Sequence, residues 1–571
     1  MKRAENVTQH HTRRFILRRI DNVRLVTSEI ITWLAIVGVL IATLGLQQVW
    51  GASAYMKSSH QAGGFYVEGI VGSIETLNPL LASNEAEASA ARLMFSSLYK
   101  YDNTGVLHTD LAASMAVKDS KIYTVTLRDA AWQDGQPLTA DDVVYTIGLI
   151  KNPRARSPLR VNWTDVTVNK VNQNTVEFTL PTVYAAFPHA LTFSIVPKHL
   201  LQNIDPASLR GSTFSQNPVG SGPFKFRRLQ TVDSSNASKV LQLVPNSRYY
   251  GMTPRISRFE LRTYPNETAF ANAIKNSEVT GAVGAPAEAL GNKQYRTVSE
   301  LLDKGMYLLF NTKNPILQDK VVRQALQLAT DTAAIRQAVG GGVRELDGPI
   351  LPSSLPGASL ARAPKLDAGK AAKLLEDAGW KLKNNSSSRR KNDQELKLII
   401  TTTSSGQYKK IAEIVKKQWS AIGVAVEVNE VDTTSAASNF VQGVLQPRNF
   451  DVLMYELTLG ADPDVYAYWH SSQASATGYN FANYSNQSSD AALASARSRL
   501  EPDLRTAKYA QFVQQWLNDA PAVALYQVSS EYLVNTNSYI VEPDGSLPEL
   551  SDRYVRVSEW SVSPATVYKT P

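Results

Sequence analysis

The feature that most constrains this chain is an uncharged, apolar run near its start. No residue from Ile30 to Met56 is charged. The stretch from Ile30 to Trp50 has the length of a helix that crosses the hydrocarbon core of a bilayer. The sequence holds no second run of about 18 apolar residues. It therefore predicts one transmembrane helix at residues 30–50, followed by a large folded body.

The charges on either side of this run predict its orientation. Basic side chains are frequent before it, and the first charged residue after it is Lys57. Because basic flanks favour the cytoplasmic side, we expect a cytoplasmic basic tail at residues 1–29 and a linker at residues 51–64. The protein is then a single-pass protein of the cell membrane, and its body is extracellular or periplasmic.

A cleaved signal peptide is the alternative reading of the same segment. Ala52, Ser53 and Ala54 form an A-x-A-like cleavage site. We favour an uncleaved signal anchor, because the apolar stretch is longer than the usual core of a signal peptide and the region before it is long. A thioether-linked lipid anchor is excluded, since the chain has no cysteine.

Composition and motifs argue against an enzyme. The absence of cysteine excludes disulfides, thiol nucleophiles and cysteine-ligated metals. The 7 histidines do not form a metal-binding spacing, and neither a phosphate-binding P-loop nor a G-x-S-x-G elbow occurs. Gly220, Ser221 and Gly222 lie between two prolines and are predicted to form a structural turn. We therefore expect no catalytic residue, no metal and no cofactor.

The charge distribution argues against nucleic acid as a partner. About half of the formal net charge of +8 lies in residues 1–29. The excess that remains for the body is too dilute for a nucleic-acid surface.

Periodicity predicts that the body mixes strands and helices. Its first half reads as strands at 65–71 and 122–128, a helix at 86–98 and a hairpin of 166–171 with 176–180. Thr139 and Asp142 form a capping box that starts a further helix.

The second half is more regular. It predicts helices at 321–329, 332–339, 368–378, 408–422 and 504–517, and strands at 396–402, 424–428, 450–457 and 523–528. The strand–helix–strand order around residue 410 predicts a parallel pair. The polar, charged insert at 381–395 is predicted to be a solvated surface loop. Together these elements define an α/β chain.

Four ordered groups of motifs resemble one known family. They are Leu98–Asp102 with Asp134–Val143, Asn217–Phe224, Phe310–Thr312 with Val322–Leu326, and Lys370–Trp380 followed by Asp462–Asp464. This set resembles the family-5 extracellular solute-binding proteins, the dipeptide- and oligopeptide-binding type of ABC importers. The resemblance covers about residues 65–540.

The resemblance implies a particular architecture for the body. It is the two-lobed periplasmic-binding-protein-like fold of cluster C, with an extra small domain. Lobe I is then built from residues 65–98, 216–311 and 526–571, the accessory domain from 99–215 and lobe II from 312–525.

The resemblance also implies a function and partners. The expected function is capture of a peptide or peptide-like solute between the lobes and its delivery, by a monomer, to ABC permease subunits. Two alternatives remain. One is an extracellular sensor that signals through a partner membrane protein, and the other is a peptide hydrolase built on the same frame.

By the same resemblance, strand 450–457 and the loop to Asp462 face the solute. The predicted lining residues are Tyr455, Leu457, Leu459, Asp462 and Trp469. The alternative for Leu457 and Leu459 is that both belong to the core of lobe II, because they share one face of a strand.

One position departs from the family pattern. The family's peptide binders hold the peptide's α-amino group with an acidic residue four positions before the proline that Pro463 matches, and here that residue is Leu459. A buried ammonium without a partner is costly. Either another carboxylate pairs with the α-amino group, with Glu456 and Asp462 as the nearest candidates, or the ligand lacks a free amine at this position. Asp462 is alternatively a cap for the segment after it.

Overall fold

The structure is a computed structural model that describes residues 27, 29, 31–47, 56–60, 62–233, 238–383, 386–433, 439–562 and 564–568. The chain divides into two compact units, Met1–Gln61 with Ser563–Pro571 and Ala62–Val562. We describe each unit by itself. Most of the predicted basic tail at 1–29 and the last residues of the predicted span, 48–50, lie outside the described residues.

The first unit contains a helix and a pair of strands. Residues 31–47 are helical, and all of their side chains are exposed. Strand β1 (Met56–His60) pairs with β21 (Pro564–Tyr568) in antiparallel register. Within the described residues, no helix combines the length and the hydropathy that crossing a membrane requires.

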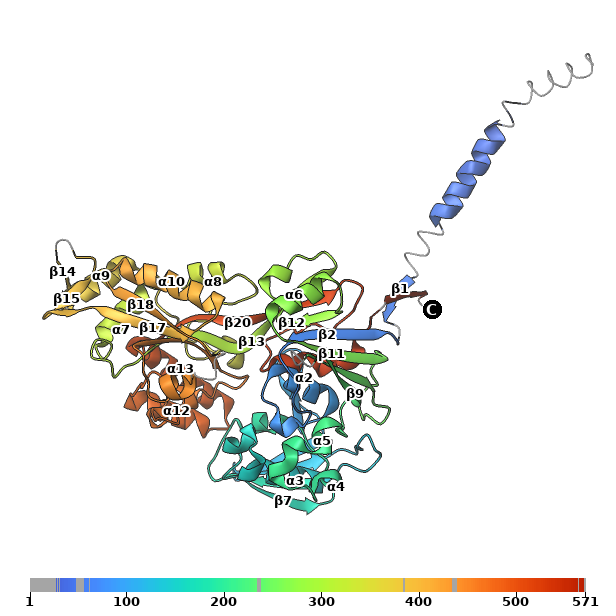
Figure 1. The fold of residues 1–571 in the computed structure, drawn as a ribbon, viewed down its shortest axis with the longest axis horizontal. Helices are drawn as coiled ribbons and strands as arrows, with labels where there is room; N and C mark the ends of the chain where they lie inside the picture. Colours follow the sequence, from blue (N-terminus) through green and yellow to red (C-terminus); the bar gives the residue numbers. More distant parts are fainter. Residues whose placement is uncertain are drawn as a thin grey trace, which may run out of the picture. The chain divides into compact units, whose positions relative to one another are not determined.

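The second unit is organised by one sheet of ten strands (Figure 1). In spatial order these are β18 (Ala425–Val431), β17 (Lys397–Thr403), β19 (Val452–Thr458), β13 (Tyr295–Phe310), β20 (Ala522–Asn535), β12 (Gly281–Val283), β2 (Phe65–Val71), β11 (Arg258–Tyr264), β10 (Ser238–Pro245) and β9 (Phe224–Asp233). Strands β18, β17 and β19 belong to the lobe II half of the sheet. Strands β12, β2, β11, β10 and β9 belong to the lobe I half.

Two long strands join these halves. In β20, residues 522–527 pair with the end of β13 beside β19, and residues 529–535 pair with its start beside β12. The register between β13 and β20 shifts between Leu301 and Gly305. Periodicity predicted only the first part of β20 and missed β13, because charged residues interrupt the apolar pattern of these strands.

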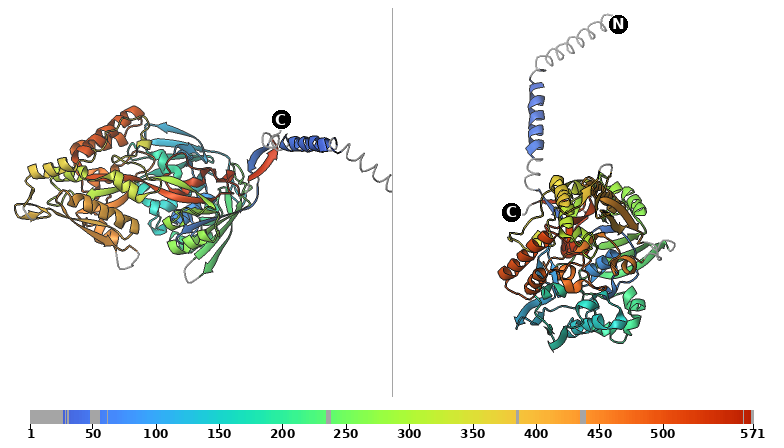
Figure 2. Two further views of the ribbon diagram at one scale, coloured as in Figure 1. Left: turned by 90° about the horizontal axis from the view of Figure 1, so that it is seen from above. Right: turned by 90° about the vertical axis from the view of Figure 1, so that its left-hand side faces the viewer.

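The lobe II strands are covered on both faces (Figure 2). Helices α7 (Lys320–Leu328), α8 (Thr332–Val339), α9 (Ala368–Asp377) and α10 (Gly406–Ser420) pack on one face, around the buried Trp419. Helices α12 (Gln487–Arg497) and α13 (Pro502–Asp519) pack on the other, around Trp516. The predicted parallel pair is confirmed, since β17 and β18 run parallel on either side of α10 in the sequence.

A smaller four-stranded sheet lies in the accessory region. Its order is β5 (Ala112–Lys118), β6 (Ile122–Leu127), β8 (Thr175–Thr179) and β7 (Thr167–Asn172), which confirms the predicted hairpin. Strands β3 (Tyr99–Tyr101) and β4 (Leu107–Thr109) form a separate pair. The helices of lobe I and this region are α2 (Glu85–Met94), α3 (Ala140–Lys151), α4 (Lys198–Leu201), α5 (Thr213–Gln216) and α6 (Glu267–Lys275).

Two local predictions at turns are confirmed. Helix α3 begins after Thr139, whose backbone N–H donates to the Asp142 carboxylate at 2.8 Å. Gly220 and Gly222 pack against the end of α2, where a Cβ on Gly220 would lie 1.9 Å from the carbonyl oxygen of Met94. The Ser221 hydroxyl accepts from the backbone of Ser96 at 3.2 Å. The Gly-Ser-Gly segment is therefore a tight packing turn.

The predicted surface loop at 381–395 is wrong for the residues that the structure describes there. They form three short strands, β14 (Lys381–Leu382), β15 (Arg389–Lys391) and β16 (Gln394–Glu395). Arg389 is buried and donates to the carbonyl oxygens of Trp380 and Ile422. The polar composition concealed this order, because an arginine can be buried when backbone oxygens satisfy its donors.

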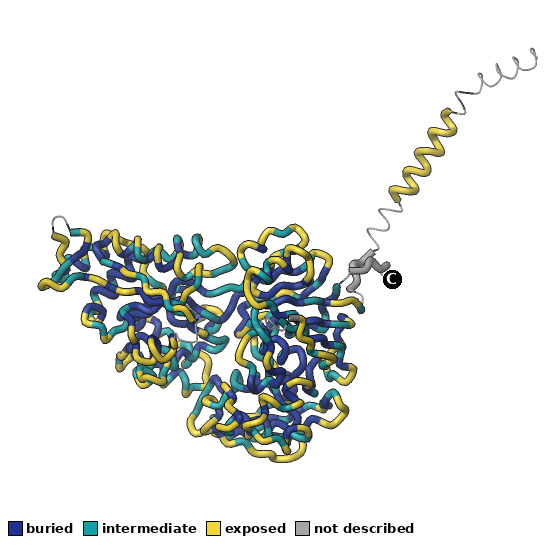
Figure 3. The backbone as a smooth tube through the Cα atoms, viewed as in Figure 1, coloured by how far each residue is buried: buried dark blue, intermediate teal, exposed yellow. Residues whose placement is uncertain are grey.

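The core of lobe I contains a buried ionic cluster. Arg553, on the short helical segment η10 (Leu550–Glu559), lies 3.3 Å from Glu68 of β2, and both side chains are inaccessible to solvent. The hydroxyl of Tyr532 also donates to Glu68, at 2.7 Å. Glu300 of β13 is almost fully buried beside this group. Figure 3 shows buried backbone throughout the sheet.

Candidate solute-binding cleft

The accessory region meets lobe II at a small set of polar contacts. The backbone N–H of Ala185 donates to the carbonyl oxygen of Arg497, at the end of α12, over 2.9 Å. The Arg497 guanidinium lies 4.7 Å from the ring centroids of both Tyr184 and Tyr466, so it joins the two regions. Its Nε is 3.2 Å from Asp464. The lobes therefore touch each other beyond the two strands that join them.

Asp462 belongs to this contact region. Its carboxylate forms a bidentate ion pair with Arg505 of α13 at 2.7 and 2.5 Å, and it lies 3.7 Å from His189 of the accessory region. It also accepts from the backbone N–H of Asp464 at 2.9 Å. Burial lowers the pKa of His189, the nearby Asp462 charge opposes this shift and the Arg505 charge reinforces it. Asp462 thus makes the predicted capping contact. Its negative charge is balanced by the guanidinium of Arg505.

Three predicted lining residues follow one another along the same face of β19 and its extension. Tyr455 is half-buried, whereas Leu457 and Leu459 are buried, with 2% and 5% of their surface exposed. All three pack in or against the core cluster around α12 and α13. This burial agrees with the alternative that Leu457 and Leu459 are core residues of lobe II. That the three residues line the solute site stays a prediction.

Trp469, the fifth predicted lining residue, lies deep in the same core. Helix α11 (Tyr466–Trp469) carries it, and no part of its side chain is exposed. Its ring is 5.3 Å from that of Trp516 and 6.1 Å from that of Tyr307, both in edge-on geometry. Its lining role also stays a prediction.

A wall of tyrosines extends from Tyr455 toward solvent. The ring of Tyr455 lies 5.8 Å from Phe481, which lies 6.2 Å from Tyr479, and Tyr479 lies 6.5 Å from Tyr468. Tyr479 is 57% exposed. The Tyr468 hydroxyl donates to the carbonyl oxygen of Thr458 at 2.6 Å, which fixes the wall to the end of β19.

Facing residues come from lobe I and from β13. The carbonyl oxygen of Asp303 accepts from Leu459 and Gly460, at 2.8 and 3.1 Å, so Asp303 lies directly opposite the position where the family's acid is expected. Asp552 of η10 forms an ion pair with Arg92 of α2. Glu549 precedes η10, and its backbone N–H donates to Asp552 at 3.1 Å.

These carboxylates outnumber the cations beside them. Burial raises the pKa of Asp303, a contact with the Ser546 hydroxyl lowers it, and the charge of Asp552 raises it further. Burial also raises the pKa of Glu549, which Lys304 opposes and Asp552 reinforces. Among the described residues, neither Asp303 nor Glu549 has an ion-pair partner within 4.0 Å. Asp303 at the end of the first part of β13 and Glu549 before η10 are therefore carboxylates without an ion pair among the described residues.

The two carboxylates that the sequence singled out are placed differently. Glu456 lies on the opposite face of β19 from Tyr455 and is 3.5 Å from Lys304. Asp462 is paired with Arg505, as described above. Sequence reasoning missed Asp303, which is remote along the chain. The signal that could have found it is the presence of charged residues inside the otherwise apolar run 295–310.

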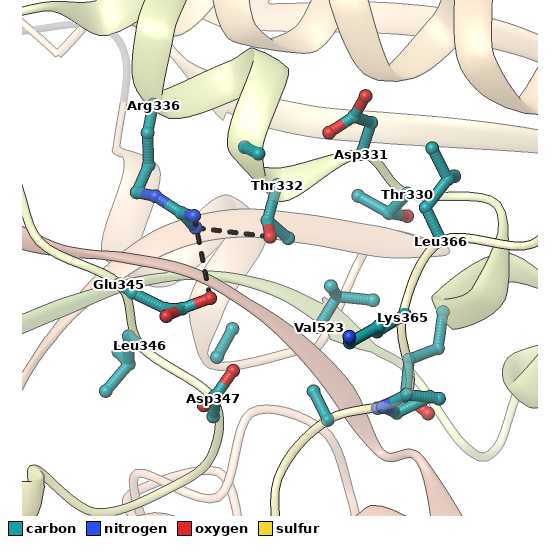
Figure 4. Close-up of a pocket in the computed structure, with 15 residues that line it drawn as sticks. Thr330, Asp331, Thr332, Arg336, Glu345, Leu346, Asp347, Lys365, Leu366 and Val523 are labelled. Atoms are coloured by element: carbon teal, nitrogen blue, oxygen red, sulfur yellow. Dashed lines mark hydrogen bonds and ion pairs between the residues drawn. The ribbon is translucent and has the colours of Figure 1, made fainter.

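A separate pocket of about 190 Å³ lies in lobe II (Figure 4). Arg336 of α8 lies at its edge, where it donates to Thr332 at 3.2 Å and lies 3.6 Å from Glu345. Its remaining wall includes Asp347, Lys365 and Val523, and none of the five predicted lining residues borders it. Within the described residues, no group of three or more histidine and acidic side chains is arranged to hold a metal ion.

An α/β body whose two halves are joined by long strands is the architecture of two-lobed solute-binding proteins. The family model described as bacterial extracellular solute-binding proteins, family 5 Middle, matches residues 106–479, which is more than half of the chain. The chain therefore belongs to this family, whose members serve ABC importers. It is a binding protein and not an enzyme.

Individual relatives agree with this assignment. The oligopeptide-binding protein AppA of Bacillus subtilis (strain 168) is 28% identical over 501 residues, which cover 84% of this chain and 88% of AppA. The structure of NikZ from Campylobacter jejuni in complex with Ni(L-His) is similar, with 26% identity and a TM-score of 0.71, over 87% of this chain and 99% of NikZ. The structure of Bacillus subtilis AppA with a nonapeptide has a TM-score of 0.67 at 24% identity, over 88% of this chain and 100% of AppA. This likeness supports the two-lobed fold.

Proposed function

We propose that this chain is a membrane-tethered receptor that captures a peptide or peptide-like solute between its lobes and delivers it to the permease of an ABC importer. The observation that carries the proposal is the contact of Ala185 and Tyr184 with Arg497, which brings the accessory region against lobe II beside a polar, tyrosine-lined cleft. Lobe closure is favoured by a ligand only through contacts that the open form lacks. Extended peptides offer backbone donors and acceptors for such contacts.

The comparisons support a peptide as the solute. AppA, the relative with 28% identity, is an oligopeptide-binding protein, and its structure contains a nonapeptide. NikZ contains a nickel–histidine complex, which shows that this fold also accepts small solutes. The exposed ring of Tyr479, beside Tyr468 and Phe481, offers aromatic surface to the side chains of a peptide ligand.

Thermal unfolding of the full-length chain in detergent tests the binding function. A peptide ligand should raise the melting temperature in proportion to the logarithm of its concentration. Mass spectrometry should find peptides among the small molecules that co-purify with the chain, and it should find no cleavage of added peptide. A chain that no peptide stabilises, and that co-purifies with a non-peptide solute, would contradict a peptide receptor.

The closure contact can be tested with a matched pair of variants. Arg497→Met removes the contacts with Tyr184, Tyr466 and Asp464. Arg499→Met removes a guanidinium from the same helix end, where it contacts Ser495. We expect the first variant to bind peptide more weakly than the second. Equal affinities would exclude a role of the Arg497 contact in closure.

The membrane tether is part of the same proposal. It is supported by the uncharged segment 30–50 and by the basic residues before it. Analysis of the amino-terminal residues of the native, membrane-associated protein tests it. Residues before Ala54 should be present, whereas a mature chain that starts at Tyr55 would show cleavage and secretion.

A further inference from the structure

A histidine lies where the accessory region meets lobe II. His189 belongs to the short helical segment η4 (Phe187–Thr192) of the accessory region, and its Nε2 is 3.7 Å from the carboxylate of Asp462 in lobe II. Its Nδ1 is 3.0 Å from the hydroxyl of Tyr101, on β3. Side chains of both regions therefore enclose the imidazole ring, and 28% of the His189 side chain stays exposed.

This contact depends on how the lobes are arranged. Lobe I and lobe II are joined by the long strands β13 and β20, about which a hinge motion can separate them. Such a motion would break the contact of His189 with Asp462, together with that of Ala185 with Arg497. Tyr101 would stay beside His189, because both belong to the accessory region. The surroundings of the ring therefore differ between the closed and the open form.

The charges at the contact disfavour a protonated ring. Arg505 of α13 binds both carboxylate oxygens of Asp462, and Arg497 lies 3.2 Å from Asp464. Each of the two carboxylates is thus matched by one guanidinium. A proton on His189 would add a positive charge without a partner beside Asp462 and Arg505, whose side chains are largely buried. Because such a charge is costly away from water, the closed contact favours the neutral ring.

Tyr101 fixes which nitrogen faces lobe II. Its hydroxyl bonds with Nδ1, so that Nε2 is the nitrogen directed at Asp462. A neutral imidazole keeps one acceptor nitrogen for such a hydroxyl, whereas a protonated ring has two donors. Burial lowers the pKa of His189, and Arg505 reinforces this shift while Asp462 opposes it. The direction of the shift agrees with the charge balance of the contact.

We propose that His189 is a proton-sensitive latch, whose neutral ring holds the accessory region on lobe II and whose protonation releases it. The proposal rests on the receptor function proposed above and adds its regulation. Solute should be held more tightly at neutral pH than in mildly acidic surroundings, because only the closed form requires the ring to be neutral.

Energy transfer between two fluorescent labels tests the latch without a ligand. The chain has no cysteine, so a full-length double variant with Val171→Cys and Leu382→Cys is labelled at these two positions alone. Val171 lies on β7 of the accessory region and Leu382 on β14 of lobe II, and their side chains are 56% and 50% exposed. Separation of the lobes changes the distance between the labels and hence the transfer efficiency.

The expected size of the effect follows from the ordinary pKa of histidine, about 6.5. At pH 7.5 the ring is neutral in the open form as well, and closure has no proton to remove. At pH 5.5 most open molecules carry the proton, which closure must remove. The ratio of closed to open molecules should therefore fall by up to about tenfold between pH 7.5 and pH 5.5.

Two histidine variants locate this response. His189→Gln keeps a neutral polar side chain and removes the titration, so its ratio of closed to open molecules should be equal at both pH values. His199→Gln is the matched control, because Nε2 of His199 is 2.7 Å from Asp134 and both residues belong to the accessory region. It should respond to pH as the unsubstituted chain does, since this pair does not cross between the lobes.

Binding of a peptide then connects the latch to the receptor function. The probe is an N-acetylated, C-amidated nonapeptide of alternating serine and alanine, which has no titratable group, and its affinity is measured by calorimetry. The affinity should fall by up to about tenfold between pH 7.5 and pH 5.5 in the unsubstituted chain. It should not change with pH in His189→Gln.

The outcomes separate the latch from the proposed function. Equal transfer at both pH values in the unsubstituted chain overturns the latch, even if His189→Gln does not fold. A pH response that persists in His189→Gln belongs to another group and also overturns it. If the peptide binds equally at both pH values, the latch is wrong and the receptor function stands. If transfer responds to pH through His189 but no peptide binds, the latch stands and the peptide receptor fails.

Discussion

The two halves of the ten-stranded sheet bury different chemistry. The lobe I half encloses Arg553 and Glu68 without solvent contact, beside the nearly inaccessible Glu300. The lobe II half is filled by aliphatic and aromatic side chains, such as Leu398 and Trp419. Apolar burial gains free energy at every pH, whereas buried charges depend on their partners and on protonation. We therefore expect the ionic cluster of lobe I to make a pH-dependent contribution to stability, whereas the apolar core around Trp419 contributes equally at every pH.

The largest effect is expected where the lobe I cluster loses its cation. Arg553→Met leaves Glu68 and Glu300 buried without a guanidinium. Breaking a buried pair in this way costs about 3–5 kcal/mol of unfolding free energy. Urea unfolding of the full-length chain at pH 8 measures it, and we expect the loss to be smaller at pH 6, where Glu300 is protonated. A loss below about 1 kcal/mol at pH 8 would show that the cluster does not depend on this charge.

In the lobe II half, the substitution expected to lower the free energy of unfolding is one that leaves a cavity in the apolar core. Leu398 lies on β17, is fully buried and packs in the cluster around Trp419. Leu398→Ala should cost about 3 kcal/mol, through lost transfer free energy and the cavity that remains. Because no titratable group is involved, the cost should be the same at pH 6.5 and pH 9. A cost that changes with pH would show that titratable groups contribute to the environment of Leu398 and would contradict an apolar lobe II core.

This contrast also explains how far the sequence predicts the fold. Alternating valines and an amphipathic helix predicted β18 and α10 to within a few residues, because a one-sided apolar pattern fixes both period and face. Strand β13 was missed entirely, since Glu300, Asp303 and Lys304 interrupt its pattern. These charges are buried by partners from distant parts of the chain, such as Arg553. Local sequence carries no information about such partners.

The same reason limits the prediction of the site. Tyr455 and Asp462 follow local motifs. Asp462 lies at the contact between the accessory region and lobe II, and Tyr455 belongs to the tyrosine wall. Asp303 and Glu549 lie about 250 residues apart in the sequence and converge only through the fold. Their convergence depends on β13 pairing with β19 and on η10 packing against α2. Neither contact has a local sequence signal.

A moderate, pH-dependent effect is expected from Glu300 itself. Burial raises its pKa to about 8, with Arg553 opposing and Glu68 reinforcing the shift. The folded state therefore holds a proton that the unfolded state has lost at neutral pH, so stability falls as the pH rises from about 4.5 to about 8 and levels off above that. Glu300→Gln imitates the protonated form. It should match the wild type near pH 4.5 and exceed it increasingly up to about pH 8, by about 1.4 kcal/mol for each pH unit, with no further gain above pH 8.

Unfolding curves of both proteins at several pH values between 5 and 9 measure this difference. Burial lowers the pKa values of His189 and His470, but both histidines titrate alike in the two proteins, so their contribution cancels in the difference. Two parallel stability profiles would mean that Glu300 does not titrate in this range, and the contrast between the two halves would then rest on Arg553 alone.

The smallest effect is expected three residues from Arg553, at Arg556. Its guanidinium forms two hydrogen bonds of 2.6 Å with Glu559, yet 43% of its side chain is exposed. Water screens this pair and solvates each partner when the other is removed, so Arg556→Met should change the free energy of unfolding by no more than about 0.5 kcal/mol. The two variants remove the same cation from the same segment, η10, and differ in burial. If Arg556→Met proved as costly as Arg553→Met, the loss would arise from disturbing η10, and buried charge would no longer explain why lobe I differs from lobe II.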